Sequence, residues 1–253
     1  MLARRVVVCL DVQGGRVVKG EHFVRLRDMG DPVALAERYE AEGADEIVFL
    51  DISASADERA TLLDVARRTA DRLFIPLTLG GGIRTANDVS MALRAGADKV
   101  SINSAAVAQP ELFAECAGRF GSQCVVASID AKREGDAWQV YTHGGRTRTT
   151  LDAVAWAREC AERGAGEILV TSIDRDGTRA GYDLELTRAI AGAVHVPVVA
   201  SGGAGSASDV RDALEGGSAD AALVAGILHD GSTTVGEIKS VLRSAGIPVR
   251  AVV

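Results

Sequence analysis

The chain has 253 residues, of which 47% are hydrophobic and 25% charged, the profile of a globular protein with an ample core. This length suits either two small domains or one large α/β domain. The formal net charge of −7 argues against a non-specific nucleic-acid surface, and no apolar run approaches the length of a membrane span.

Short apolar segments alternate with amphipathic ones along the whole chain. We expect eight strands, at Val6–Asp11, Glu46–Asp51, Ile75–Leu79, Lys99–Ile102, Cys124–Asp130, Glu167–Thr171, Val198–Ala200 and Ala221–Val224. They are continuously apolar, as in a parallel sheet that is buried on both faces. Helical segments lie between them, and Asp31, Thr85 and Ser206 are the expected N-caps of three of these helices. Eight β–α units of this kind predict an α/β fold, a single (β/α)8 TIM barrel.

A Rossmann-type sheet is the competing architecture. Against it, no G-x-G-x-x-G motif follows the first strand, where Gly14-Gly15 instead begins a long loop that we expect to reach about Asp31. The segment from Arg133 to Thr149 lies outside the alternation and predicts a small hairpin after the fifth strand.

The two halves of the chain resemble each other. Matching segments are VVVCLDVQ (6–13) with VVASIDAK (125–132), and PLTLGGG (76–82) with PVVASGG (197–203). We therefore expect two half-barrels, at about 1–120 and 121–253, within one barrel. Equivalent loops would then share the rim at the carboxyl ends of the strands, which is where barrel enzymes hold their active sites.

The four cysteines show no C-x-x-C spacing, so we expect reduced, packed thiols. They are Cys9, Cys116, Cys124 and Cys160. The amino terminus also lacks the hydrophobic region of a signal peptide. These features predict a cytoplasmic protein.

Glycines follow the third and the seventh expected strand, at positions 80–82 and 202–203. Backbone N–H groups without neighbouring side chains can approach a phosphate closely. The next strands end at Asn103-Ser104 and at Ala225-Gly226. Either loop alone is as easily a tight turn as a ligand site, whereas the symmetric pair favours phosphate binding. We call the loops at 80–82 and 103–104 the first phosphate cradle, and the loops at 202–203 and 225–226 the second. Two such cradles predict a long substrate with a phosphate at each end.

Asp11 and Asp130 end equivalent strands and would face each other across the barrel mouth. Paired carboxylates in different surroundings can act as general acid and base. The alternative is that each one caps a loop or pairs with a neighbour such as Lys19 or Lys132. Weaker acid candidates are Asp51, Asp174 and Asp176, and Thr171 and Lys19 could bind a substrate.

The histidines are scattered without the spacing of metal ligands, so we expect no metal and no cofactor. They are His22, His143, His195 and His229.

Four charged residues stand at the amino-terminal starts of strands, and we expect them to form a ring across the barrel floor. They are Arg5, Glu46, Lys99 and Glu167. From the residues alone, a structural salt-bridge network is the preferred interpretation.

Seven segments distributed along residues 9–205 carry a family resemblance. They are CLDVQGGRVVKG (9–20), FLDISAS (49–55), GGGIR (80–84), GADKVSIN (96–103), FGSQCVVASIDAKR (120–133), GAGEILVTSIDRDGT (164–178) and ASGGAG (200–205). They resemble the cyclase subunit of imidazole glycerol phosphate synthase, the HisF family of histidine biosynthesis. The resemblance implies a lyase that uses ammonia to convert N'-phosphoribulosyl-formimino-AICAR ribonucleotide to imidazole glycerol phosphate and AICAR ribonucleotide.

The resemblance also implies roles for individual residues. Asp11 would be the principal acid and base, with Asp130 as its partner. The implied phosphate contacts are Gly82, Asn103 and Ser104 at one end of the substrate, and Asp176, Gly177, Gly203, Ala225 and Gly226 at the other. The family usually has serine at the position of Gly226, so a backbone contact remains there while the hydroxyl contact is lost.

For the four-charge ring, the resemblance reverses the interpretation from the residues alone, because the family has a gate for ammonia there. A partner glutaminase would supply the ammonia and form a heterodimer through the amino-terminal face, with Asp98 as a contact. No nucleic-acid or membrane partner is implied.

Two alternatives stay open. The sister isomerase of the same pathway is also a duplicated barrel with two aspartates, but TSIDRDGT (171–178), Lys19-Gly20 and the charged ring favour the cyclase. The other alternative is a non-catalytic barrel that binds a phosphorylated metabolite.

Overall fold

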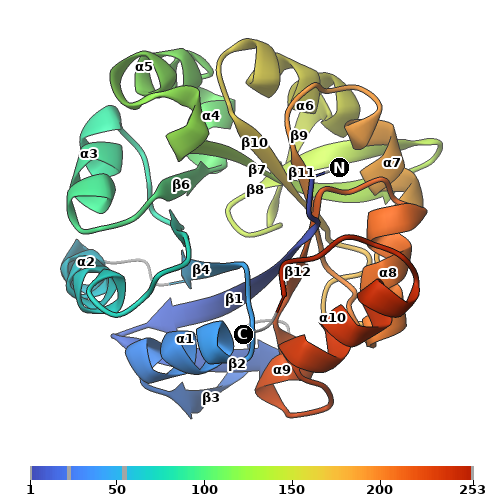
Figure 1. Ribbon diagram of the computed structural model, residues 1–253. Helices are drawn as coiled ribbons and strands as arrows, with labels where there is room; N and C mark the ends of the chain where they lie inside the picture. Colours follow the sequence, from blue (N-terminus) through green and yellow to red (C-terminus); the bar gives the residue numbers. More distant parts are fainter. Residues whose placement is uncertain (1, 22–23, 53–55, 252–253) are drawn as a thin grey trace.

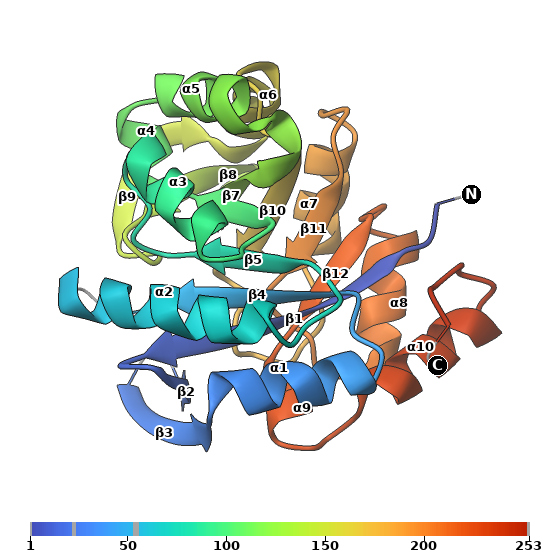
Figure 2. The same cartoon turned by 60° about the vertical axis from the view of Figure 1, so that its left-hand side comes forward.

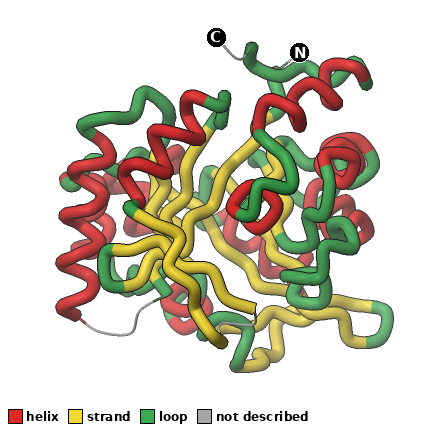
Figure 3. The backbone as a smooth tube through the Cα atoms, turned by 90° about the horizontal axis from the view of Figure 1, so that it is seen from below, coloured by secondary structure: helices red, strands yellow, loops and turns green. Residues whose placement is uncertain are grey.

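The computed structural model describes residues 2–21, 24–52 and 56–251 and shows a closed parallel barrel inside a layer of helices (Figures 1 and 3). In barrel order the strands are β1 (Arg5–Gln13), β4 (Glu46–Asp51), β5 (Leu77–Gly80), β6 (Lys99–Ile102), β7 (Val125–Glu134), β10 (Glu167–Ser172), β11 (Val198–Ser201) and β12 (Ala221–Val224). Each pairs in parallel with the next, and β12 pairs with β1 to close the barrel. The predicted TIM barrel and its eight strands are confirmed. His22 lies outside the described residues.

The helices pack around the barrel, and three of them begin at the predicted caps (Figure 1). They are α1 (Pro32–Ala41), α2 (Ala56–Ala70), α3 (Ala86–Arg94), α4 (Ser104–Ala108), α5 (Glu111–Phe120), α6 (Ala153–Glu162), α7 (Leu184–Ala191), α8 (Ala207–Glu215), α9 (Gly226–His229) and α10 (Val235–Ser244). Asp31, Thr85 and Ser206 each accept a hydrogen bond from the backbone N–H three residues later, as helix caps do. No helix within the described ranges is long and apolar enough to cross a membrane.

The expected long loop after β1 is instead an antiparallel hairpin, so that prediction was wrong. β2 (Arg16–Glu21) pairs with β1 and with β3 (Val24–Gly30). Gln13 lies opposite Arg16, and the two residues between them, Gly14 and Gly15, have φ angles of 56° and 76°. Two consecutive positive φ angles match the tight turn that glycine pairs favour in hairpins. The glycines therefore turn the chain back on itself.

The hairpin predicted after the fifth strand is confirmed, and it is continuous with the barrel. β7 runs past Asp130 to Glu134 because β8 (Ala137–Thr142) pairs with it in antiparallel fashion, and β9 (Thr147–Asp152) pairs with β8. Figure 2 shows the β2–β3 hairpin on the side of the β1 and β4 arrowheads, with both termini on the opposite side.

Side chains of β1 alternate between two environments. Val6 and Val8 pack between the sheet and the helices, whereas Val7 belongs to a separate cluster inside the barrel. By the same period of two, Arg5 and Asp11 face inward at opposite ends of the strand. The interior cluster comprises Val7, Cys9, Val48, Val126, Leu169, Val199, Ala221 and Leu223. One strand therefore carries a charged residue at each end of an apolar barrel interior.

Aspartates at the amino-terminal rim fasten neighbouring strands to one another. The side chains of three of them accept backbone N–H hydrogen bonds, Asp45 from Val6 at 2.8 Å, Asp98 from Leu77 at 2.8 Å and Asp220 from Val198 at 3.1 Å. The fourth equivalent position is Gly166, where a Cβ atom would lie 2.3 Å from the carbonyl oxygen of Ser122. These contacts fit the internal repeat, while the half-barrel boundary near residue 120 stays a prediction.

Candidate active site

Asp11 lies at the inward-facing end of β1, in the mouth of the barrel. Burial, and then the negative charge of Asp176, raise its pKa from 3.8 to about 7. Among the described residues Asp11 forms no salt bridge, and the expected alternative partner, Lys19, pairs elsewhere. Asp11 can therefore hold or release a proton near neutral pH.

Asp130 occupies the matching position on β7, beside Thr171 of β10 in the strand register. Asn103 donates a hydrogen bond from Nδ2 to Asp130 Oδ2 at 3.0 Å. Burial and the charge of Asp176 raise the pKa of Asp130 to about 6, and the Asn103 hydrogen bond offsets part of this increase. No salt bridge to Lys132 forms among the described residues, so the second carboxylate also lacks a cation.

Asp176 connects the two carboxylates electrostatically. Its backbone N–H donates to the carbonyl oxygen of Ser172 at 2.9 Å, which sets it in the turn after β10. Its charge raises the pKa of both Asp11 and Asp130. The sequence predicts Asp176 as a weaker acid, and the family resemblance implies a phosphate contact there. The structure adds that it makes the other two carboxyl groups harder to ionise.

The weaker acid candidate Asp174 has a structural partner, because its Oδ2 accepts a hydrogen bond from the backbone N–H of Arg133 at 2.7 Å. This contact ties the turn after β10 to the extension of β7. The third weak candidate, Asp51, ends β4.

The first glycine cradle contains two glycines that the packing of its turn requires. A Cβ atom at Gly80 would lie 2.4 Å from Ser101 Oγ, and one at Gly81 would lie 2.1 Å from the carbonyl oxygen of Asp51. Packing alone therefore requires these two glycines, as the tight-turn interpretation holds. Gly82, with a φ of 65°, follows them and is left as the position for the predicted phosphate contact.

The β8–β9 turn reaches this cradle, which sequence reasoning missed. The backbone N–H of His143 donates to Ser104 Oγ at 2.9 Å, and His143 has a φ of 56°. Ser104 begins α4 directly after Asn103, the residue that holds Asp130. The first cradle, the hairpin and one carboxylate therefore form one connected unit.

The second cradle is packed against the turn that carries Asp176 and Gly177. A Cβ atom at Gly203 would lie 2.2 Å from the carbonyl oxygen of Gly181, and the Gly181 N–H donates to the Gly203 carbonyl at 2.9 Å. Nothing lies within 4 Å of a Cβ atom at Gly177. Ala225 and Gly226 follow β12 and lead into α9. Lys19 reaches this loop, where its Nζ donates to the Gly226 carbonyl at 3.0 Å.

His229 is a second residue that sequence reasoning missed. Its Nε2 lies 3.0 Å from the carbonyl oxygen of Cys9 and its Nδ1 lies 2.7 Å from the hydroxyl of Tyr39. A carbonyl only accepts, so Nε2 carries the proton and Tyr39 donates to Nδ1. Burial lowers the His229 pKa to about 4 and keeps it neutral. It ties α9, after the second cradle, to β1 two residues before Asp11, and no spacing in the sequence signals this contact.

At the opposite end of the barrel, the four predicted floor residues form a closed ring of alternating charge. Lys99 Nζ lies 2.8 Å from Glu46 Oε2 and 2.8 Å from Glu167 Oε2. Arg5 pairs with Glu46 at 3.0 Å and also with Glu167. Thr78 Oγ1 donates to the remaining oxygen of Glu46 at 2.6 Å. The predicted ring geometry is confirmed.

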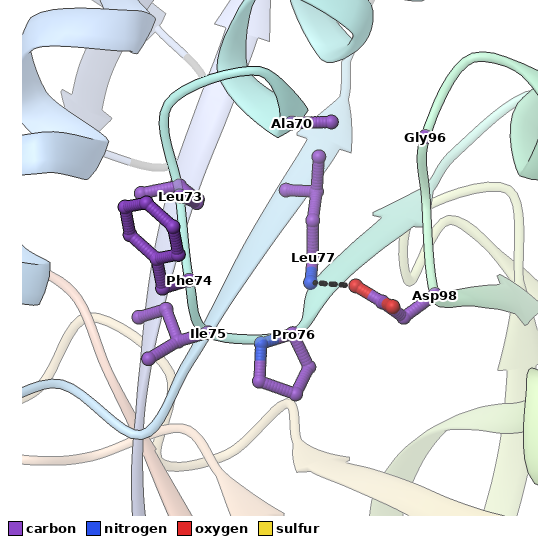
Figure 4. A pocket seen from close by; sticks show the side chains of 8 residues that line it. All are labelled: Ala70, Leu73, Phe74, Ile75, Pro76, Leu77, Gly96 and Asp98. Carbon is purple, nitrogen blue, oxygen red and sulfur yellow. Dashed lines mark hydrogen bonds between the residues drawn. The ribbon is translucent and has the colours of Figure 1, made fainter.

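Beside the floor ring, the amino-terminal face carries an open hollow of about 320 Å³ (Figure 4). Its lining residues are Ala70, Leu73, Phe74, Ile75, Pro76, Leu77, Gly96 and Asp98. Phe74 is 94% exposed, and Figure 4 shows Asp98 hydrogen-bonded to the Leu77 N–H at the other side of the hollow.

Comparison with known proteins finds a matching family and proteins of similar sequence. A family model described as histidine biosynthesis protein matches residues 5–234. Over 251 residues the chain is 72% identical to imidazole glycerol phosphate synthase subunit HisF of Myxococcus xanthus (strain DK1622), with 99% of each chain covered. It is 60% identical over 256 residues to the protein of the same name from Thermosynechococcus vestitus, which covers 99% of this chain and 91% of the relative.

Proposed function

The chain belongs to the histidine biosynthesis protein family, as a HisF-type cyclase subunit of imidazole glycerol phosphate synthase, and we propose that Asp11 and Asp130 perform its lyase chemistry. In this reaction ammonia attacks the bisphosphate N'-phosphoribulosyl-formimino-AICAR ribonucleotide. The imidazole ring of imidazole glycerol phosphate closes, and AICAR ribonucleotide leaves.

The observation that carries the proposal is a pair of buried carboxylates at matching positions of β1 and β7, without a salt bridge among the described residues, whose burial raises the pKa to about 7 at Asp11 and about 6 at Asp130. The reaction needs a proton taken from the attacking nitrogen and a proton given to the departing amine. A group with a pKa near the working pH can do both. Asp11 has the higher pKa and delivers the proton to the leaving amine, while ionised Asp130 on the opposite strand accepts one.

The two cradles bind the two phosphates of the substrate. Gly82, Asn103 and Ser104 hold one phosphate, and the loops around Gly203 and Gly226 hold the other. Asp176 and Gly177 contribute to the second cradle, and Thr171 and Lys19 contact the substrate between them. Because Gly226 has no hydroxyl, its contact is made through backbone atoms.

Ammonia reaches the carboxylates through the barrel. The ring of Arg5, Glu46, Lys99 and Glu167 is its gate, and the apolar cluster above the ring favours neutral ammonia over ammonium, since burying an unpaired charge is costly.

A glutaminase subunit docks on the amino-terminal face and supplies the ammonia. The hollow offers a recess beside the exposed aromatic side chain of Phe74, and Asp98 offers a charge. Asp45 pairs with Lys239 at 2.7 Å and Asp220 pairs with Arg4, whereas Asp98 has no cationic partner among the described residues. A lysine or arginine of the glutaminase supplies that missing charge. We place this complex in the cytoplasm, because all four cysteines are free thiols.

Incubation of the purified chain with the bisphosphate and an ammonium salt tests the function, with release of the aminoimidazole product as the signal. We expect turnover that depends on ammonium. Isomerisation of the bisphosphate without release of the aminoimidazole product would favour the sister isomerase, and no ammonium-dependent release would contradict the cyclase proposal. Co-purification with the glutaminase, and its loss in an Asp98→Lys variant, tests the docking face.

A further inference from the structure

Three charged side chains from distant parts of the chain meet beside the second cradle. Asp230, directly after α9, accepts from Lys19 Nζ at 3.3 Å through Oδ2 and also pairs with the guanidinium of Arg179. Lys19 Nζ lies 3.0 Å from the carbonyl oxygen of Gly226. Two cations thus share one carboxylate, and the cluster keeps one positive charge in excess.

Ser232 fixes the position of Asp230. Its backbone N–H donates to Asp230 Oδ1 at 3.0 Å and its hydroxyl donates to the same oxygen at 2.5 Å. The other oxygen, Oδ2, is the one that faces the two cations. Asp230 therefore stays in place whether or not Lys19 and Arg179 remain bound to it.

The backbone of Arg179 is held against the second cradle. A Cβ atom at Gly205 would lie 2.1 Å from the carbonyl oxygen of Arg179, and Gly181 bonds to Gly203 at 2.9 Å. From this position beside residues 203–205 the side chain extends to Asp230, beyond Gly226 and α9. The half-exposed side chain of Arg179 therefore joins the loop of residues 203–205 to the end of α9.

Arg179 also adopts a backbone conformation that its residue type disfavours. Its φ is 57°, and only His143 and Ser218 share a positive φ among the non-glycine residues that the structure describes. Glycine or asparagine would adopt this conformation at lower cost. His143 contacts the first cradle through Ser104, so two of the three strained positions flank the two cradles. Strain retained at such positions is typical of functional sites.

We propose that Arg179 binds the phosphate held by the second cradle, and that Asp230 is a counter-ion which keeps Arg179 and Lys19 beside the empty cradle until the phosphate displaces it. This inference rests on the proposed function and adds a residue to its second phosphate site. A guanidinium offers a phosphate two parallel N–H donors and a full charge. It compensates for the hydroxyl that Gly226 does not supply.

The test compares the KM for the bisphosphate, in ammonium-dependent turnover, among Arg179→Asn, Arg179→Lys and Asp230→Asn. Arg179→Asn removes the charge and keeps a residue that tolerates the positive φ, and we expect KM to rise about 10-fold while kcat changes less than about 2-fold. Arg179→Lys should recover most of the loss. Asp230→Asn removes the competitor of the phosphate, and we expect KM to fall about 3-fold.

The opposite signs separate this role from a structural ion pair, since either substitution breaks the same pair and a structural role would move KM in one direction. Changes of equal sign, or a wild-type KM in Arg179→Asn, would overturn the inference. Arg211→Asn on α8, which breaks a pair with Asp212, is the matched control and should leave KM unchanged. Absence of turnover in the wild-type protein would instead count against the proposed function.

In that event, calorimetric titration with inorganic phosphate tests the inference without turnover. Arg179→Asn should weaken one of the two phosphate-binding steps and Asp230→Asn should strengthen it. Equal phosphate affinities in the wild type and in both variants would overturn the proposal.

Discussion

Charged side chains inside the barrel are paired at one end, and two carboxylates lack a partner of opposite charge at the other, among the residues that the structure describes. At the floor, Glu46 and Glu167 each lie between Arg5 and Lys99, so that every charge faces two of opposite sign. At the mouth, Asp11 and Asp130 have no cationic partner among the described residues. The charge of a third carboxylate, Asp176, raises the pKa of both.

The same strands serve both ends, because inward-facing positions of β1 run from Arg5 through the apolar interior to Asp11. Paired charges in a buried layer hold neighbouring strands in place. Burial raises the pKa of unpaired carboxylates. A carboxyl group with a raised pKa contributes little to stability but is a good acid near neutral pH. The difference teaches that one fold can separate rigidity from reactivity by supplying or withholding counter-ions.

The largest expected effect comes from removing the reactive charge. Asp11→Asn should lower kcat by about 1,000-fold, within the range of general acid–base catalysis, while calorimetry shows unchanged binding of the bisphosphate. Asp174→Asn removes an equal charge from the same rim and is the control, since Asp174 only accepts a backbone hydrogen bond. Full activity in Asp11→Asn would mean that the mouth is not the reactive end.

Breaking the floor ring should affect stability. Lys99→Met leaves Glu46 and Glu167 with Arg5 as their shared cation, and loss of one partner from a buried ion pair costs about 3 kcal/mol. Urea unfolding would measure this loss, with the exposed Lys132→Met as control, for which less than about 0.5 kcal/mol is expected. An unchanged free energy of unfolding in Lys99→Met would show that the ring does not hold the floor together.

The contribution of Asp11 to the stability of the fold should depend on pH with the opposite sign to that of a carboxylate in an ordinary ion pair. The Asp11 pKa is raised from 3.8 to about 7, so the folded state binds the proton more tightly and loses stability as pH rises through this window. Asp11→Asn should therefore stabilise the protein by about 2 kcal/mol at pH 8, about half of the full linkage because the side chain is partly open to solvent. At pH 4 the difference should vanish. Equal differences at both pH values would point to packing rather than charge.

The smallest expected effect concerns the difference between the two carboxylates. Asn103 lowers the Asp130 pKa through its hydrogen bond, so Asn103→Ala should raise that pKa above about 6, by less than about one unit. Carboxyl NMR titration without substrate would measure the shift. Ser104→Ala alters the same cradle without touching Asp130 and should leave it unmoved. A lower Asp130 pKa in Asn103→Ala would contradict the assignment of this bond.

Much of the fold follows from local sequence. Apolar segments of strand length, separated by capped helices, predict the barrel, whereas the inward direction of Arg5 and Asp11 follows from the two packing clusters of β1. The strands β2 and β3 were missed because Gly14-Gly15, which forms the tight turn between β1 and β2, was interpreted as the start of a loop.

The site was predicted less completely, because several of its contacts join residues far apart in the chain. Asp11 and Asp130 occupy matching positions in two repeated segments, and that repetition made them visible. His229 and Cys9, or Arg179 and Asp230, share no pattern, and only the closed barrel brings them together. The glycines at positions 80 and 81 show the reverse case, where a motif that suggests a ligand is required by packing.

Direct titration of the two carboxyl groups tests the central claim most closely. In protein labelled with ¹³C at aspartate carboxyls, two signals should titrate near pH 7 and pH 6, and each should disappear in Asp11→Asn or Asp130→Asn respectively. The same two values should bound the pH profile of ammonium-dependent turnover. Titration of both groups near their ordinary value of about 4 would contradict the account, because neither could then hold a proton at neutral pH.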